Sequence, residues 1–187
     1  MLSNTNNALL FLIDTVMSLY IIIVVLRVIL QMVHADFRNP ISQFVWQITR
    51  VPVNFLRKII PRWRNVDLPA VVFALILCYI LIQIDLFLVA PEFGPQLLPA
   101  IAWAVLKAAV LVCNFYFMTV LIQAIMSWIS PNQHSPATAL LFTINEPLLR
   151  PVRNTLPAIG GLDLSPLVVI IVLQVVSRLL PLPALFR

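Results

Sequence analysis

The residues of this chain that could do chemistry are charged side chains set within long apolar runs. Asp14, Asp85, Lys107 and Arg178 each lie inside such a run, and Arg27 lies near the end of the first. Charge within hydrocarbon is costly and by default marks a functional site. Because alternate spans run in opposite directions, the first four charges are predicted to lie toward the same face of the membrane. Two acids and two bases at one depth favour mutual pairing.

Two uses of this charged layer stay open. Structural ion pairs that orient the helices, or side chains that reach the headgroups, explain the layer without transport. A path for cations through the layer is the other use. Arg27, whose equivalent in the internal repeat described below is Gln123, is predicted to reach the headgroups on the opposite side.

No catalytic residue, metal ligand set or cofactor is predicted. Neither His34 nor His134 has a second histidine within ligand spacing, and the chain has no glycine-rich phosphate loop or nucleophile elbow. Cys78 and Cys113 lie in apolar runs and form no CxxC motif. The chain is therefore not expected to be an enzyme.

The elements that must hold these charges are membrane-spanning helices. Of the 187 residues, 61% are hydrophobic and only 10% are charged, whereas soluble domains carry about 25% charged residues. The composition also excludes disorder, which needs low hydrophobicity and high charge. Four apolar stretches are long enough to cross a bilayer, the last of them marginally: about 8–33, 70–90, 100–129 and 167–180.

Prolines and glycines lie outside these four stretches. The chain has 15 prolines and three glycines, and proline is the commonest cause of a sharp kink in a helix. The spans are therefore predicted to be unkinked, and the prolines to mark the boundaries of spans and connecting segments. The lack of glycine in the spans disfavours a potassium filter or a broken-helix transport site.

Basic residues gather in the segments after the first and third apolar stretches: Arg38, Arg50, Arg57, Lys58, Arg62, Arg64, Arg150 and Arg153. The N-terminal tail and the link over 91–99 contain none. By the positive-inside rule both basic segments are predicted to be cytoplasmic. The chain is thus expected to be a multi-pass protein of the bacterial inner (plasma) membrane with both termini on the outer, periplasmic side.

An internal repeat relates the two halves at a constant offset of 96 positions. Without a gap, the following residues match: Tyr20 with Tyr116, Pro40 with Pro136, Ile48 with Ile144, Arg57 with Arg153, Pro61 with Pro157 and Asp67 with Asp163. Repeat 1 (8–90) places spans at 8–33 and 70–90 around a basic segment at 34–69. Repeat 2 (100–182) places spans at 100–130 and 167–182 around a segment at 131–166. Two crossings per repeat make the halves parallel.

The fold class predicted is therefore an all-α membrane protein with four transmembrane helices from two parallel tandem repeats. Each repeat is expected to carry a cytoplasmic interfacial segment. In the first, Ile41, Phe44, Val45 and Ile48 form an apolar stripe at helical spacing, typical of a helix lying in the headgroup plane. A second short piece is expected to follow it and to end at Pro61.

Four basic residues of these segments are candidate docking residues: Arg57, Lys58, Arg150 and Arg153. One interpretation is that they enforce topology and contact the phosphates of anionic lipids, each contributing about 1 kcal/mol. The other is that Arg57 and Arg153, equivalent by the repeat, form a pseudo-symmetric docking site for a partner or a specific lipid.

Two aspartates precede the second span of each repeat. Asp67 and Asp163 are predicted to cap the free N–H groups of the helices that follow, with Ser165 as an alternative cap in the second copy. Pro69 and Pro166 fit the first turn of such helices.

Several motifs carry a resemblance to a known family: Asn39-Pro40, Phe55-Leu56-Arg57, Ile60-Pro61 and Asp67-Leu68 in the first copy, and Pro147–Arg153, Gly160-Gly161 and Asp163–Pro166 in the second. With these motifs the chain resembles the YggT family over nearly its whole length. The first copy departs from the pattern, because Trp63-Arg64-Asn65 replaces the glycine pair. The resemblance implies an inner-membrane protein linked to osmotic-shock tolerance and potassium handling. In plastids and cyanobacteria, the relatives are linked to division, nucleoid placement and maturation of a membrane cytochrome complex.

The function expected from these observations is a scaffold or assembly factor. Its partners are expected to be membrane lipids with anionic headgroups, other membrane or division proteins and, as a further option, a second copy of the chain, with no direct contact to nucleic acid. The alternative is a subunit of a potassium channel or transporter.

Overall fold

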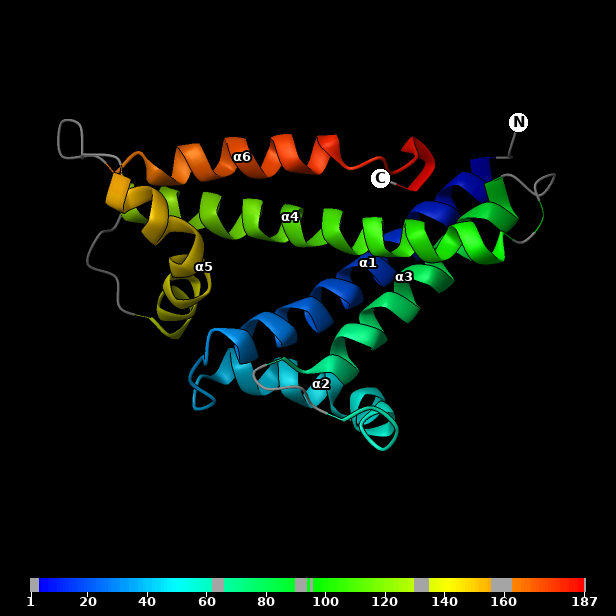
Figure 1. Ribbon diagram of the computed structural model, residues 1–187, viewed down its shortest axis with the longest axis horizontal. Coiled ribbons are helices and arrows are strands. Elements are labelled where there is room, and N and C mark those ends of the chain that lie inside the picture. Colours follow the sequence, from blue (N-terminus) through cyan, green and yellow to red (C-terminus); the bar gives the residue numbers. More distant parts are fainter. Residues whose placement is uncertain are drawn as a thin grey trace.

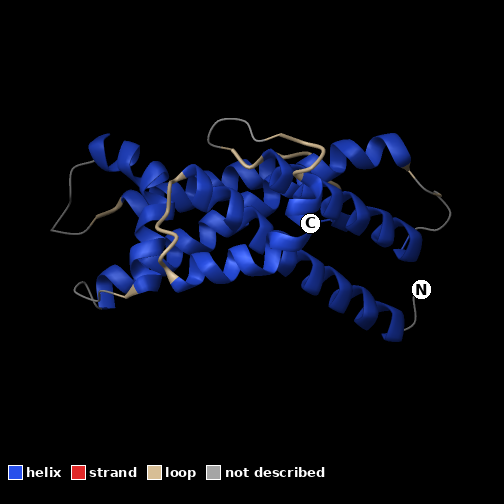
Figure 2. Ribbon diagram, turned by 90° about the horizontal axis from the view of Figure 1, so that it is seen from below, coloured by secondary structure: helices blue, strands red, loops and turns tan. Residues whose placement is uncertain are grey.

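The chain folds as two similar groups of three helices (Figure 1). The computed structural model describes residues 4–61, 66–89, 94, 96–129, 135–155 and 163–186. Within these ranges, helices are joined by loops (Figure 2). The elements are α1 (Asn4–Met32), α2 (Pro40–Leu56), α3 (Leu68–Val89), α4 (Leu97–Ile129), α5 (Pro136–Thr155), α6 (Ser165–Leu179) and the short 3₁₀ helix η2 (Ala184–Phe186).

The same packing pattern occurs in both halves. In the first repeat α1 packs along α3, and the shorter α2 contacts both helices. In the second repeat α4 packs along α6, and α5, which with 20 residues is longer than α6, again contacts both. The tandem repeat predicted from the sequence is consistent with this arrangement. The start of α1 lies on the same side of the molecule as the end of α3 and the start of α4, whereas α2 and α5 lie at the other ends of the helix pairs (Figure 1).

The repeats meet mainly through α3 and α4. The side-chain amide of Asn39, just before α2, donates a hydrogen bond to the carbonyl of Pro136 at the start of α5 (2.6 Å). At the other end, the indole of Trp103 on α4 contacts the ring of Phe186 in η2, with 5.3 Å between centroids. The chain end therefore folds back onto the helices.

Three helices are long and apolar enough to cross a membrane: residues 8–32 of α1, 68–89 of α3 and 97–127 of α4. The fourth apolar helix, α6, has 15 residues. At about 1.5 Å per residue it spans about 22 Å, less than the hydrocarbon core of about 30 Å. The helix is about as long as the span predicted over 167–182, but it begins two residues earlier and ends three residues earlier.

The segments between the long helices differ from prediction. Each was expected to contain a short amphipathic helix and a second short piece that ends at Pro61 or Pro157, but α2 continues through Pro52, and α5 continues through Pro147 and Pro151. Proline in a helix removes one hydrogen bond and leaves a carbonyl to be satisfied elsewhere. Pro147 and Pro151 are exposed, so the freed carbonyls lie on a face where water or headgroups can bind them. Pro157 lies outside the described residues.

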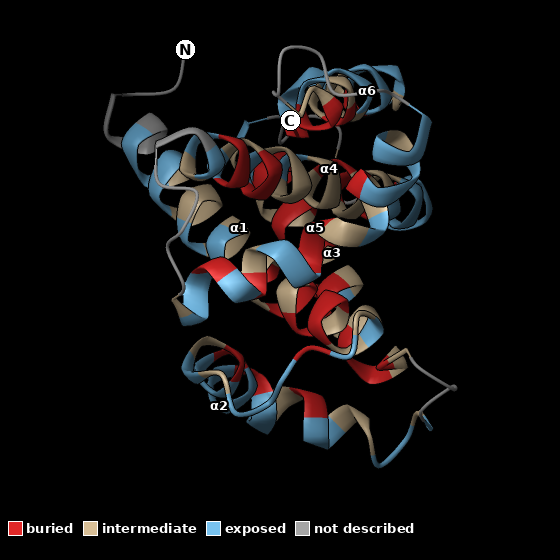
Figure 3. Cartoon of the chain, turned by 90° about the vertical axis from the view of Figure 1, so that its left-hand side faces the viewer, coloured by how far each residue is buried: buried red, intermediate tan, exposed pale blue. Residues whose placement is uncertain are grey.

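Buried side chains concentrate in the first repeat. One large apolar core joins α1, α2, α3 and the first half of α4, and it also includes Leu140 and Ile144 of α5 and Leu182 and Phe186 near the chain end. Figure 3 shows the buried residues along the helices. The core of the second repeat consists of Val120, Leu149 and Val169 with a few partly buried neighbours. Much of α6 presents apolar residues at the surface, including Leu167, Ile171 and Leu179.

Candidate functional site

Four polar residues of the first repeat form one buried cluster, here called the first-repeat cluster: Arg27, Thr49, Arg57 and Asp67. Asp67 Oδ2 accepts hydrogen bonds from Arg27 Nε (3.2 Å) and Arg57 Nη2 (2.9 Å). Arg27 Nη1 donates to Thr49 Oγ1 at 2.8 Å. The four residues come from α1, α2, the turn after α2 and the position just before α3. The cluster therefore ties all three helices of this repeat together.

The first-repeat cluster carries excess positive charge, because two arginines share one carboxylate. The Asp67 side chain is only 1% exposed. Among the described residues, Arg57 Nε and Asp67 Oδ1 are buried without a hydrogen-bond partner. Removing one member of a buried ion pair leaves an uncompensated charge and costs several kcal/mol. Asp67 is thus the residue on which the cohesion of this cluster depends.

The second repeat has a neutral cluster, here called the second-repeat cluster, in which two of the three residues take equivalent positions: Thr119, Gln123 and Asn145. Thr119 Oγ1 donates to Asn145 Oδ1, and Asn145 Nδ2 donates to Gln123 Oε1, both at 2.8 Å. All three side chains are buried. Gln123 stands where the first repeat has Arg27, and Asn145 where it has Thr49. The cluster joins α4 to α5 without charge.

The carboxylate equivalent to Asp67 lies at the surface in the second repeat. Asp163 Oδ2 accepts a hydrogen bond from Arg153 Nε (3.0 Å), and Arg153 Nη1 also contacts Glu146 Oε2 (3.4 Å). The Asp163 side chain is 40% exposed. Burial alone raises the pKa of Asp163, but hydrogen bonds from Ser165 and Arg153 and the charge of Arg153 outweigh it and hold that pKa below its ordinary value.

Three of the four charges predicted to share one layer come together between the repeats. Lys107 Nζ on α4 lies 3.0 Å from Asp14 Oδ1 on α1 and 3.7 Å from Asp85 Oδ2 on α3. We call these residues the terminal triad. Lys107 and Asp85 are buried, whereas Asp14 is 46% exposed. Arg178 is exposed near the end of α6.

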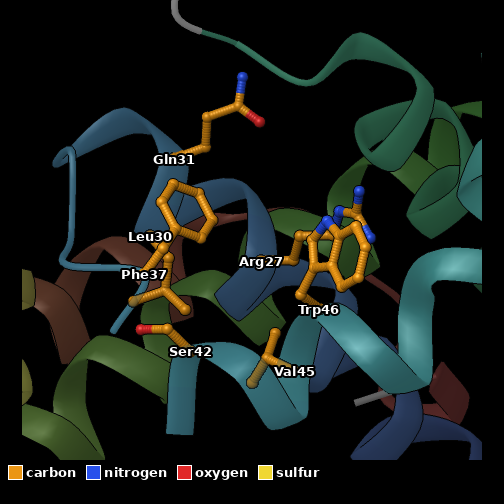
Figure 4. A pocket seen from close by; sticks show the side chains of 7 residues that line it. All are labelled: Arg27, Leu30, Gln31, Phe37, Ser42, Val45 and Trp46. Atoms are coloured by element: carbon orange, nitrogen blue, oxygen red, sulfur yellow. The ribbon is translucent and has the colours of Figure 1, made fainter. Parts of the chain in front are cut away.

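A pocket of mixed polarity lies beside the first-repeat cluster, between the end of α1 and α2 (Figure 4). We call it the Trp46 pocket. One cavity of about 200 Å³ is lined by Arg27, Leu30, Gln31, Phe37, Ser42, Val45 and Trp46. A second cavity of about 490 Å³ is lined by Phe37, Gln43, Trp46, Gln47, Arg50 and Val51. The two share Phe37 and Trp46, and the Arg50 guanidinium lies 5.5 Å from the centroid of the Trp46 ring.

The candidate docking residues divide into two groups. Arg57 and Arg153 each bind the aspartate ten positions later, Asp67 and Asp163 respectively. Lys58 and Arg150 are exposed. The structure therefore gives the first two an ion-pairing role within each repeat and leaves the other two on the surface.

The predicted helix caps also divide. Asp163 Oδ1 accepts a hydrogen bond from the backbone N–H of Ser165 (2.9 Å), at the first residue of α6. The Asp67 side chain binds the two arginines instead of the N–H groups of α3, so the cap predicted for it is wrong. Ser165 is not the N-cap either, because α6 begins at Ser165 and Leu164 holds that position without a side-chain hydrogen bond.

Sequence reasoning missed Thr49, Asn145, Thr119 and the pocket residues Ser42 and Trp46. A signal for the first two was present, because Thr49 and Asn145 are matched polar residues within otherwise apolar stripes. The Arg–Asp pairs also had a signal, since both repeats separate the two residues by ten positions. The pocket had none, since it depends on how the loop after α1 turns.

Comparison with known proteins gives several relatives of similar length. The chain is 41% identical over 178 residues to an "Uncharacterized protein in proC 3'region" of Vibrio alginolyticus, covering 93% of this chain and 94% of that protein. It is 39% identical over 171 residues to "Uncharacterized protein YggT" of Escherichia coli, covering 91% and 88%. It is 37% identical over 174 residues to "Uncharacterized protein PA0392" of Pseudomonas aeruginosa, covering 93% and 88%.

No solved structure matches this chain. The model of the CCB3/YggT family matches twice, over residues 6–88 and over residues 102–184. The two matched segments coincide with the two groups of three helices, each with its own polar cluster. The chain therefore belongs to the CCB3/YggT family and contains two tandem copies of its repeat.

Proposed function

We propose that this chain is a membrane-embedded scaffold or assembly factor of the bacterial inner membrane and has no catalytic activity of its own. The observation that carries the proposal is the repeated three-helix unit, in which a polar cluster ties α2 to α1 and to the start of α3 in the first repeat and ties α5 to α4 in the second. Such a unit is suited to present a fixed surface to a binding partner. Osmotic-stress tolerance and cell division are the settings in which we expect it to act.

The surface proposed for docking consists of the outer faces of α2 and α5. Both helices expose large apolar side chains, including Phe44, Val51 and Phe142, next to the exposed cations Lys58 and Arg150. This mixture suits a helix at the headgroup level that also meets anionic lipids or an acidic partner. We propose that this end of the molecule is cytoplasmic, in line with the positive-inside rule.

The proposal includes a fourth crossing by α6. The helix is short, but the apolar residues from Leu180 to Phe186 continue its path. Single cysteines at Lys58 and Arg150 should then react with a membrane-impermeant reagent from the cytoplasm only. Cysteines at Leu98 and Leu185, which are exposed near the other end, should react from the periplasm only. A shared side for Lys58 and Leu185 would rule out the fourth crossing.

Photo-crosslinking in cells tests the scaffold role. A photoreactive residue at Lys58 or Arg150 should give the same discrete adduct, because both belong to one surface. Leu98, at the opposite end and 80% exposed, is the matched control and should give none. Reversal of the remaining cation, as in Arg150→Glu, should abolish the adduct formed from Lys58. Adducts that are equally strong from Leu98, or insensitive to charge, would contradict the proposal.

The terminal triad favours a second candidate, a subunit of a potassium channel or transporter. Asp14, Asp85 and Lys107 together carry excess negative charge within predicted spans, and intramembrane charges often line ion pathways. Purified protein in liposomes should then conduct potassium, and Asp85→Asn should reduce the flux. Liposomes that conduct no potassium would leave the scaffold as the function.

A further inference from the structure

The Trp46 pocket combines buried hydrogen-bond donors with positive charge. Ser42 is only 3% exposed, and its Oγ has no hydrogen-bond partner among the described residues. Ser42 lines the cavity together with Arg27, Gln31 and Trp46 (Figure 4). No aspartate or glutamate is among the residues that line the two cavities. The pocket is therefore suited to an anion and unsuited to a cation.

The charge around the pocket also favours an anion. Arg27 and Arg57 share the single carboxylate of Asp67, which leaves one positive charge in excess. Arg50, on the rim of the second cavity, adds another. Cations together with a serine hydroxyl are typical partners of a phosphate group, which accepts several charge-assisted hydrogen bonds.

The position of the pocket selects a lipid as the source of that phosphate. Arg27 and Gln31 lie in the last two turns of α1, at the end of a helix long enough to span the bilayer. Tryptophan and arginine are favoured at this depth because their apolar parts lie in hydrocarbon and their polar ends reach the headgroups. Exposed apolar residues of α2, Phe44 and Val51, adjoin the pocket residues in sequence and are available to acyl chains.

The second repeat supplies an internal control, because its equivalent positions lack this chemistry. Gln123 replaces Arg27, Phe142 replaces Trp46, and Glu146 reverses the charge of Arg50. Thr138, the equivalent of Ser42, donates its hydroxyl proton to the carbonyl of Ser135 (2.8 Å). An anionic headgroup is thus favoured in the first repeat and disfavoured in the second.

We propose that the Trp46 pocket binds the phosphate headgroup of one anionic phospholipid per chain, with Arg27, Ser42, Trp46 and Arg50 as the binding residues. The inference rests on the proposed function in one respect, since it requires α2 to lie at the headgroup level. It goes beyond that function by assigning a specific, saturable site to one repeat only.

Native mass spectrometry of the purified full-length protein in detergent tests the site, with phosphatidylglycerol as the probe. Wild-type protein should bind one phosphatidylglycerol saturably and phosphatidylcholine much more weakly. The variant Arg50→Gln/Trp46→Leu should bind phosphatidylglycerol at least about fivefold more weakly, because one cation near an anionic headgroup contributes about that factor. Ser42→Ala, which removes only the buried hydroxyl, should weaken binding as well.

The matched control is Glu146→Gln/Phe142→Leu at the equivalent positions of the second repeat, which should bind phosphatidylglycerol as the wild type does. Equal effects of the two double variants, or no effect of either, would overturn the proposal. So would competition by inorganic phosphate, which would identify a soluble anion as the ligand. Because no partner protein is present, a failure here leaves the crosslinking test of the scaffold intact, and the reverse also holds.

Discussion

The two repeats fix the same helices at the same positions, but one uses charge and the other uses amides. In the first repeat two arginines converge on the buried Asp67. In the second, Gln123 and Asn145 take the equivalent positions and bond to each other. Asp163 then has one arginine near it and lies partly in solvent. Of these two equivalent aspartates, only the one with two cations to compensate for its loss of water is buried.

The difference extends to packing around the clusters. The first-repeat cluster lies against the large apolar core, whereas Leu149 and Val169 belong to a core of only a few residues. A low-dielectric surrounding strengthens both the attraction within an ion cluster and the penalty for breaking it. The first repeat should therefore respond more strongly to loss of a charge than the second.

The strongest way to break this comparison is to neutralise the two equivalent aspartates. Asp67→Asn leaves the buried Arg27 and the partly buried Arg57 without this counter-charge and should lower the free energy of unfolding by about 3–5 kcal/mol. Asp163→Asn removes a half-exposed ion pair and should cost less than about 1 kcal/mol. Thermal unfolding of both variants in the same detergent measures the difference. Equal losses of stability would show that the clusters do not differ as proposed.

The terminal triad gives a second comparison between the repeats. The triad joins the two repeats, and the second repeat has no equivalent of it. Lys107→Met leaves Asp85 buried without its cation and should cost about 2–3 kcal/mol, since the carboxyl can neutralise itself by taking up a proton. Adding Asp85→Asn removes the stranded charge and should restore part of the stability. A double variant whose melting temperature is no higher than that of Lys107→Met would argue against pairing of these residues.

Neutral hydrogen bonding in the second repeat should matter less. Asn145→Leu leaves buried Thr119 and Gln123 without the partner that the structure gives them, at a cost of about 1–3 kcal/mol. Thr143→Val, on the exposed side of the same helix, is the matched control and should change stability by less than about 0.5 kcal/mol. Thermal unfolding that ranks the control as the more damaging change would refute a structural role for the second-repeat cluster.

The order and bounds of the long helices could be predicted, because each is a continuous apolar run. Stretches expected at about 70–90 and 100–129 correspond to α3 and α4 within about three residues at either end. The helices α2 and α5 were harder, because proline inside a helix is disfavoured locally and is tolerated here only through the tertiary setting. The residue pattern predicted a short amphipathic helix followed by a separate second piece, whereas α2 and α5 continue through Pro52 and Pro147.

The candidate sites were predictable only in part. That Lys107 meets Asp14 and Asp85 followed from the alternating direction of the spans, which puts them at one depth. The role of Arg57 did not follow, because an arginine beside a membrane can equally face lipid or a carboxylate. Its choice of Asp67 depends on the path of the chain between α2 and α3, which the residue pattern does not encode.

The smallest expected effect concerns pH and separates the two aspartates once more. Because the native pKa of Asp163 is below its ordinary value of about 3.9, its ion pair stabilises the fold fully above about pH 4. That contribution is lost as the pH falls through the lower native pKa, where the carboxyl becomes protonated in both states. The stability difference between wild type and Asp163→Asn should be less than about 1 kcal/mol at pH 7, since the side chain is partly exposed.

Melting temperatures of wild type and Asp163→Asn, measured in one detergent between pH 7 and pH 3, check this directly. The two curves should converge at the acid end, because protonated Asp163 then resembles the asparagine in charge. The control is Glu146→Gln, which removes the other acidic neighbour of Arg153. In that background, the melting temperatures of the proteins with and without Asp163→Asn should still differ at pH 7. A gap that widens as the pH falls would mean that Asp163 is stabilised in its protonated form, and its equivalence to the ion-paired Asp67 would have to be given up.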